Sequence, residues 1–75
     1  MRISEFQKII RDVYFEKDSK RGLGKTFMWF IEEVGELAEA LRRGNREEIG
    51  EEMADVLAWL TSLANLIGVD LEQEA

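Results

Sequence analysis

The stretch TFMWFIEEVGELAEALRR, residues 26–43, decides the fold, because its apolar residues recur at the three- and four-residue spacing of an α-helix. The members of this apolar stripe are Phe27, Phe30, Ile31, Val34, Leu37, Ala38 and Leu41. Gly44 follows directly, and glycine at this place is typical of a helix C-terminus. The pattern therefore predicts a helix over about 26–43 that buries one face.

A second long helix is predicted directly after Gly44. Asn45-x-x-Glu48 is a capping motif, and Gly68 is positioned to end the helix. The apolar stripe of this second helix comprises Ile49, Met53, Val56, Leu57, Leu60, Leu63, Ala64 and Ile67. Asn65 lies on the opposite edge, where a solvated or inter-subunit amide is expected.

The residues before and after these two helices complete an all-α prediction. Ser4-x-x-Gln7 predicts a capping box that opens an N-terminal helix, along which apolar residues recur at helical spacing. Residues 17–24 are polar and hold two glycines, so we expect a loop there. Asp70-x-x-Gln73 predicts the start of a fourth helix that is cut off where the chain ends. The expected fold is one domain, residues 1–75, with three long helices and the start of a fourth.

Composition restricts the possible functions. The 75 residues include 16 acidic and 10 basic side chains, giving a net charge of -6, which argues against binding a nucleic-acid polymer. With no Cys and no His, the chain lacks thiolate ligands and an imidazole base. No stretch reaches the roughly 18 apolar residues of a membrane span, and the N-terminus does not resemble a secretory signal. We expect a cytoplasmic protein, and its small size makes an isolated monomer marginal.

Two acidic pairs are the strongest chemical signal in the chain. Glu33 and Glu36 are three residues apart on the first long helix, and Glu52 and Asp55 have the same spacing on the second. A helical wheel places both pairs on the same flank of their apolar stripes, so packed helices would gather four carboxylates. Mg²⁺ prefers such oxygen ligands. The alternative is a solvated acidic face whose members form ion pairs with basic side chains such as Arg42.

The segment GLGKT, residues 22–26, is a weak candidate for a phosphate-binding loop. The P-loop motif needs a glycine where Ser19 stands, and it needs a preceding strand, whereas a helix is predicted. A flexible connection is favoured. Lys20, Arg21 and Lys25 nevertheless cluster beside the start of the next helix, where they could contact the outer phosphates of a ligand.

The segments EEVGELAEAL (32–41) and EEMADVLAWL (51–60) together resemble the MazG-like nucleoside triphosphate pyrophosphohydrolases. The signature of that family is E-x-x-E, a variable spacer, and E-x-x-D. The two acidic pairs match it, with 15 residues between Glu36 and Glu52. The resemblance covers about residues 26–72.

The resemblance implies an oligomeric all-α bundle related to dUTPase-like families, working as a homodimer or homotetramer. It implies that both acidic pairs hold Mg²⁺, with Mn²⁺ as a substitute. The implied reaction cleaves a nucleoside triphosphate between its α- and β-phosphates. Glu32 or Glu36 would accept the proton of the attacking water, and Trp59 could stack on the base, whereas Trp29 is expected to serve packing.

One departure from the family pattern leaves alternatives open. The last helix of the family carries basic and amide residues that contact phosphates and base, whereas this chain ends in the first turn of that helix. Base preference therefore cannot be read from the sequence. A non-catalytic helical oligomerisation module, or a nucleotide sensor that binds without turnover, is the alternative function.

Overall fold

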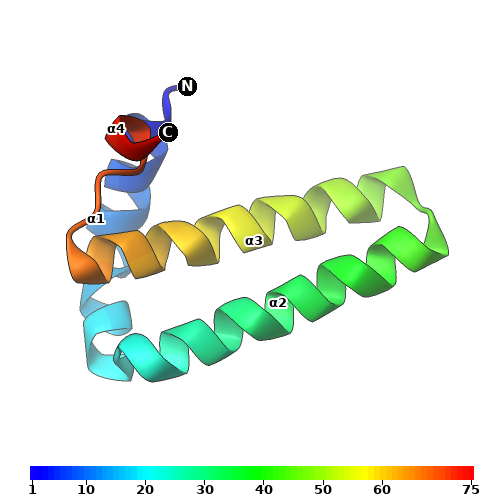
Figure 1. The fold of residues 1–75 in the computed structure, drawn as a ribbon, viewed down its shortest axis with the longest axis horizontal. Helices are drawn as coiled ribbons and strands as arrows, with labels where there is room; N and C mark the ends of the chain where they lie inside the picture. Colours follow the sequence, from blue (N-terminus) through cyan, green and yellow to red (C-terminus); the bar gives the residue numbers. More distant parts are fainter.

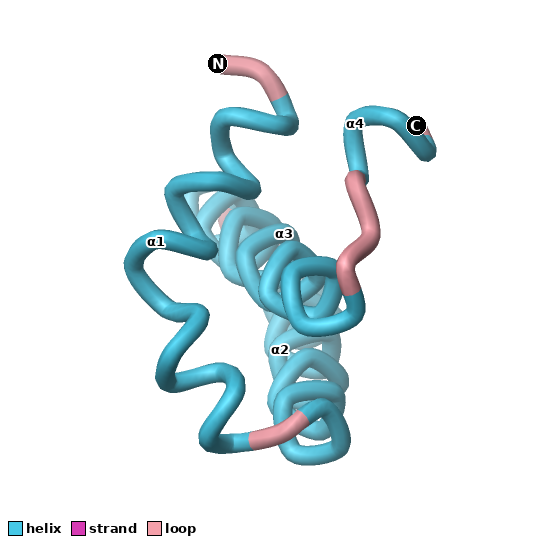
Figure 2. Tube along the Cα trace, turned by 90° about the vertical axis from the view of Figure 1, so that its left-hand side faces the viewer, coloured by secondary structure: helices cyan, strands magenta, loops and turns pink.

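The computed structural model describes residues 1–75 and consists of four helices without strands, which confirms the all-α prediction. These are α1 (Ile3–Arg21), α2 (Leu23–Arg43), α3 (Arg46–Ile67) and α4 (Leu71–Glu74). The long helices α2 and α3 run antiparallel and side by side, and α1 crosses them at one end (Figure 1). Figure 2 shows α1 along one flank of the α2–α3 pair; the short α4 packs against α1.

Capping geometry confirms the predicted C-termini of α2 and α3 and the predicted N-termini of α3 and α4, whereas α2 begins at Leu23, before the predicted start near Thr26. The Asn45 side chain accepts a hydrogen bond from the Glu48 N–H at 3.0 Å, and Asp70 accepts one from the Gln73 N–H at 3.1 Å. Gly44 and Gly68 adopt left-handed conformations, with φ of 77° and 75°, which end α2 and α3 at low steric cost.

The predicted capping box at Ser4 and Gln7 is wrong. The helix begins at Ile3, and the Glu5 carboxylate accepts from the Arg2 N–H at 2.9 Å. The Gln7 side chain instead reaches the other end of the chain: it donates to Asn65 Oδ1 at 3.0 Å and to the Val69 carbonyl at 2.7 Å. Asn65 is accordingly buried against α1, not solvated as expected, because its polar atoms find partners there.

The loop expected at residues 17–24 is also wrong. α1 continues to Arg21 and α2 starts at Leu23, so Gly22 alone joins them, with φ of 89° and ψ of 161°. The polar residues are helical because they form local pairs: Arg21 Nη1 lies 2.7 Å from Asp18 Oδ1, and Lys20 Nζ lies 3.5 Å from Glu16. Asp18 lies in the last turns of α1 and is 3% exposed.

The two long apolar stripes are largely uncovered in the protomer, which contradicts the expectation that they form its core. The only buried hydrophobic residues are Ile10, Ala40 and Ala64. Large apolar side chains that remain between 39% and 53% exposed on α2 and α3 include Leu23, Phe27, Ile31, Val34, Leu41, Met53, Leu57 and Leu60. The two helices instead meet through narrower faces; on α2, Thr26 and Ala40 are fully buried. None of the four helices combines the length and apolarity that crossing a bilayer requires.

Candidate metal centre and adjoining cavity

Three carboxylates, hereafter the acidic trio, converge where α2 and α3 run side by side. Glu33 comes from α2, and Glu52 and Asp55 come from α3; each offers an oxygen within 4.8 Å of the others. Glu33 lies seven residues from both Thr26 and Ala40, and so shares the face of α2 that is buried. Helix packing therefore determines where the Glu33 carboxylate lies.

The remaining predicted acids lie outside the acidic trio. Glu36 is exposed and is not among the three residues whose carboxylate oxygens lie within 4.8 Å of one another. Its charge still acts on the trio, raising the pKa of both Glu33 and Glu52. Glu32 is exposed as well, and its charge raises the pKa of Glu33. Both are thus close in space to the trio without belonging to it.

The acidic trio carries negative charge that the protein does not neutralise. Burial raises the pKa of Glu33, and repulsion from Asp55, Glu36 and Glu32 raises it further. Burial likewise raises the pKa of Glu52, followed by repulsion from Glu33.

No basic side chain forms an ion pair with the trio. The nearby arginines at the end of α2 pair with Glu39 instead, at 3.4 Å from Arg42 and 3.5 Å from Arg43. Clustered oxygens of like charge without a protein cation are the donor set that a hard divalent ion prefers. The residues present therefore fit Mg²⁺ or Mn²⁺.

These raised pKa values predict that repulsion in the trio destabilises the metal-free protein as pH rises. The folded state holds the protons of Glu33 and Glu52 more tightly than the unfolded chain does. Their contribution to the free energy of unfolding is therefore fully present below the ordinary pKa of 4.5, and it is lost as pH rises through the raised pKa values. Thermal unfolding should be measured in a chelator from about pH 4 to pH 7. Over this range the melting temperature of Glu33→Gln should fall less than that of the wild type. Identical pH profiles would contradict the electrostatic account.

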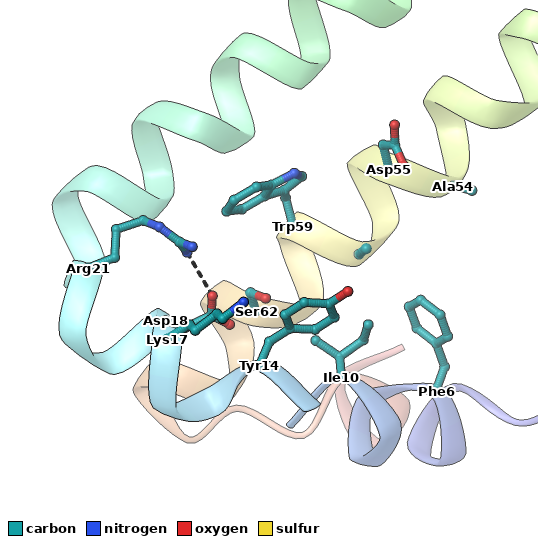
Figure 3. A pocket seen from close by; sticks show the side chains of 11 residues that line it. Phe6, Ile10, Tyr14, Lys17, Asp18, Arg21, Ala54, Asp55, Trp59 and Ser62 are labelled. Carbon is teal, nitrogen blue, oxygen red and sulfur yellow. Dashed lines mark hydrogen bonds and ion pairs between the residues drawn. The ribbon is translucent and has the colours of Figure 1, made fainter. Parts of the chain in front are cut away.

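A cavity of about 490 Å³ adjoins the acidic trio and is lined by residues of α1 and α3 (Figure 3). Asp55 belongs to the acidic trio and also lines the cavity. Phe6, Tyr14 and Trp59 line the cavity with aromatic surface. Its volume falls within the range of small-molecule sites, and its mixture of aromatic and charged walls is typical of them.

Trp59 lies between Asp55 and Arg21 in the view of Figure 3. Its ring stacks on Trp29, with centroids 6.0 Å apart and an interplanar angle of 14°, so the flanks that carry the acids do face one another across α2 and α3. The guanidinium carbon of Arg21 lies 5.0 Å from the Trp59 ring centroid. Trp59 is thus an ordered wall of the cavity.

The three basic residues expected near phosphates differ in their ion pairing. Lys25 is exposed, makes no ion pair, and stands eight residues before Glu33, about 12 Å along α2. Lys20 pairs with Glu16, and Arg21 pairs with Asp18. Of these three basic residues, Lys25 is therefore the one without an ion-pair partner.

Sequence reasoning missed the contribution of α1 to this region. Asp18, Arg21 and Tyr14 all line the cavity, although residues 17–24 were expected to form a loop. A signal was present, because Asp18 and Arg21 have opposite charges at the i,i+3 spacing of a helix. Burial of Asp18 depends on α3 and could not be deduced from that spacing.

Comparison with known proteins adds one match. The family model described as the MazG nucleotide pyrophosphohydrolase domain matches residues 22–75. The matched segment contains the acidic trio, Glu36 and both tryptophans, and it leaves out α1. No curated protein matches the chain.

Proposed function

The chain belongs to the MazG nucleotide pyrophosphohydrolase domain family, and we propose on this basis that it is a Mg²⁺-dependent nucleoside triphosphate pyrophosphohydrolase. The proposed reaction cleaves the substrate between its α- and β-phosphates and releases the nucleoside monophosphate and pyrophosphate. The observation that carries the proposal is the acidic trio, three carboxylates within 4.8 Å of one another without a basic partner. Because free nucleotides are the substrates, the proposed site of action is the cytoplasm.

The roles of the acids follow from their positions. Glu33, Glu52 and Asp55 would hold Mg²⁺, which when bound supplies charge neutralisation of the phosphates and acidifies a water molecule. Glu36 is exposed beside the trio, so it can complete the ligand set or accept a proton from the attacking water. Glu32 is the second candidate for the proton acceptor.

The substrate would lie between the acidic trio and the cavity. Trp59 lines the cavity that begins at Asp55, which supports a contact between its indole and the nucleoside part of the substrate. Lys25 is exposed and unpaired, and we propose that it contacts the substrate.

We further propose that the protein is a homodimer or a homotetramer built through the apolar stripes of α2 and α3. The protomer exposes 5475 Å² of surface, whereas a folded monomer of 8.7 kDa exposes roughly 4,700 Å². The excess, on the order of 700 Å², is close to the roughly 800 Å² that each partner buries in a stable interface. Half-exposed side chains such as Phe27 and Leu57 supply the apolar contact.

A hydrolysis assay across nucleotides tests the proposed activity. Incubation with each standard dNTP and NTP and Mg²⁺ should release pyrophosphate and the matching monophosphate, and a chelator should abolish release because the trio then lacks its cation. Release of inorganic phosphate and a diphosphate would contradict the proposed cleavage position. Binding without turnover, with Mg²⁺ or Mn²⁺, would instead favour a nucleotide sensor, and absence of binding would favour an oligomerisation module.

A further inference from the structure

The cavity ends at a buried carboxylate whose hydrogen bonding is incomplete. Asp18 lines the cavity and is 3% exposed. Its Oδ1 accepts a hydrogen bond from Arg21 at 2.7 Å, whereas its buried Oδ2 has no hydrogen-bond partner. An unsatisfied buried acceptor is costly, and most such atoms in folded proteins have a donor. A donor supplied by a ligand would satisfy Oδ2.

The position of Asp18 relative to the acidic trio matches the layout of a nucleotide. Asp55 and Ser62 both line the cavity and are seven residues apart on α3, so the cavity follows that helix for about 10 Å. Asp55 and the Asp18–Arg21 pair lie on different sides of Trp59 (Figure 3). A nucleotide whose phosphates are held at the trio would thus direct its base toward Asp18.

The chemistry of this end of the cavity discriminates among bases. An ionised carboxylate only accepts hydrogen bonds, so it attracts the exocyclic amino group of cytosine or adenine and repels a carbonyl oxygen at the same ring position. Arg21 holds the other oxygen and keeps the carboxylate in place. Aromatic surface from Tyr14, one turn before Asp18 on α1, suits the face of a planar ring.

Building on the proposed function, we propose that Asp18 determines base specificity, with its Oδ2 accepting a hydrogen bond from the amino group of the base. The enzyme accordingly prefers cytosine and adenine nucleotides to uracil and hypoxanthine nucleotides. The residues responsible belong to α1, outside the segment 22–75 that the family model matches. The proposed preference therefore depends on residues outside the matched segment.

Two matched substrate pairs test the proposal on the unmodified protein. dCTP carries an amino group where dUTP carries a carbonyl on the pyrimidine ring. dATP and dITP differ in the same way on the purine ring. The wild type should show kcat/KM about 10- to 100-fold higher for the amino member of each pair, which is the effect of one hydrogen bond to a charged group. Hydrolysis at equal rates within both pairs would overturn the role of Asp18 and leave the proposed reaction intact.

The variant Asp18→Asn should bring both pairs close to equality or invert them. Arg21 requires an oxygen at Oδ1, so the new amide nitrogen takes the place of Oδ2 and presents a donor to the base. Asp12→Asn is the matched control, because Asp12 lies on the same helix with its side chain 59% exposed and outside the cavity. An unchanged preference in Asp18→Asn, with native helicity by circular dichroism, would refute the proposal.

Binding of the monophosphates supplies a readout that does not depend on turnover or on folding of the variant. Because Trp59 lines the cavity, titration of the wild type with dCMP and dUMP in Mg²⁺ can be followed by tryptophan fluorescence. The proposal predicts binding of dCMP about 10- to 100-fold tighter than dUMP. Selective binding without hydrolysis would contradict the proposed reaction only, whereas equal or absent binding of the two would contradict base selection by Asp18.

Discussion

Replacing Asp55 with Asn is expected to lower pyrophosphate release by at least about 10²-fold, since bound Mg²⁺ stabilises the charge of the transition state by several kcal/mol. Asp55 offers one of the three clustered oxygens, and the amide cannot supply the same negative charge. Calorimetric titration should show weaker Mg²⁺ binding in parallel. Without metal, the variant should unfold at a higher temperature than the wild type, because repulsion of Glu33 and Glu52 is relieved.

Glu51→Gln is the matched control for this experiment. Glu51 is an exposed acid of the same helix and the same acidic segment, and it lies outside the acidic trio. Its substitution should leave hydrolysis and Mg²⁺ affinity unchanged. Loss of activity in both variants would indicate a general effect of net charge, and full activity of Asp55→Asn would remove the acidic trio from the reaction.

The second large effect is expected from Ile31→Lys, which should weaken self-association by about 10²- to 10³-fold in the dissociation constant. Ile31 is 50% exposed in the protomer and belongs to the apolar stripe of α2. In the proposed oligomer a lysine there would be buried without a partner charge, which costs several kcal/mol. Sedimentation velocity over a range of protein concentrations measures the shift toward monomer.

Val13→Lys controls for the loss of an exposed apolar side chain. Val13 is 62% exposed and lies on α1, so it is not a member of the stripes of α2 and α3. Association should remain as in the wild type. A wild-type protein that sediments as a single species near its 8.7 kDa mass at all concentrations would refute the proposed oligomer, whatever the variants do.

Features encoded within one helix could be predicted from the sequence. The caps at Asn45 and Asp70 and the left-handed glycines 44 and 68 depend on a few neighbouring residues, and the structure has each of them. The spacing of the acids placed them on matching flanks of two helices. Three of these carboxylates meet, whereas Glu36 stays outside the trio, although its spacing from Glu33 equals that of Glu52 from Asp55; which acids converge depends on how α2 packs against α3.

Features that depend on contacts between helices could not be predicted in the same way. Polar composition favoured a loop at residues 17–24, yet α1 continues to Arg21, with Asp18 buried and paired with Arg21. Gln7 and Asn65 are ordinary polar residues on separate helices, and only their meeting across the fold reveals a structural pair. Hydrophobic periodicity identified the stripes correctly but did not reveal that one protomer leaves them half uncovered.

The connection between α1 and α2 makes the cavity sensitive to insertions and deletions. Gly22 has φ of 89° and ψ of 161°, a combination that side-chain-bearing residues rarely adopt. Because Gly22 alone joins the two helices, one added residue would change the orientation of α1 relative to α3 and would displace Asp18. Chains that differ in length at this joint would therefore present a differently shaped cavity between α1 and α3.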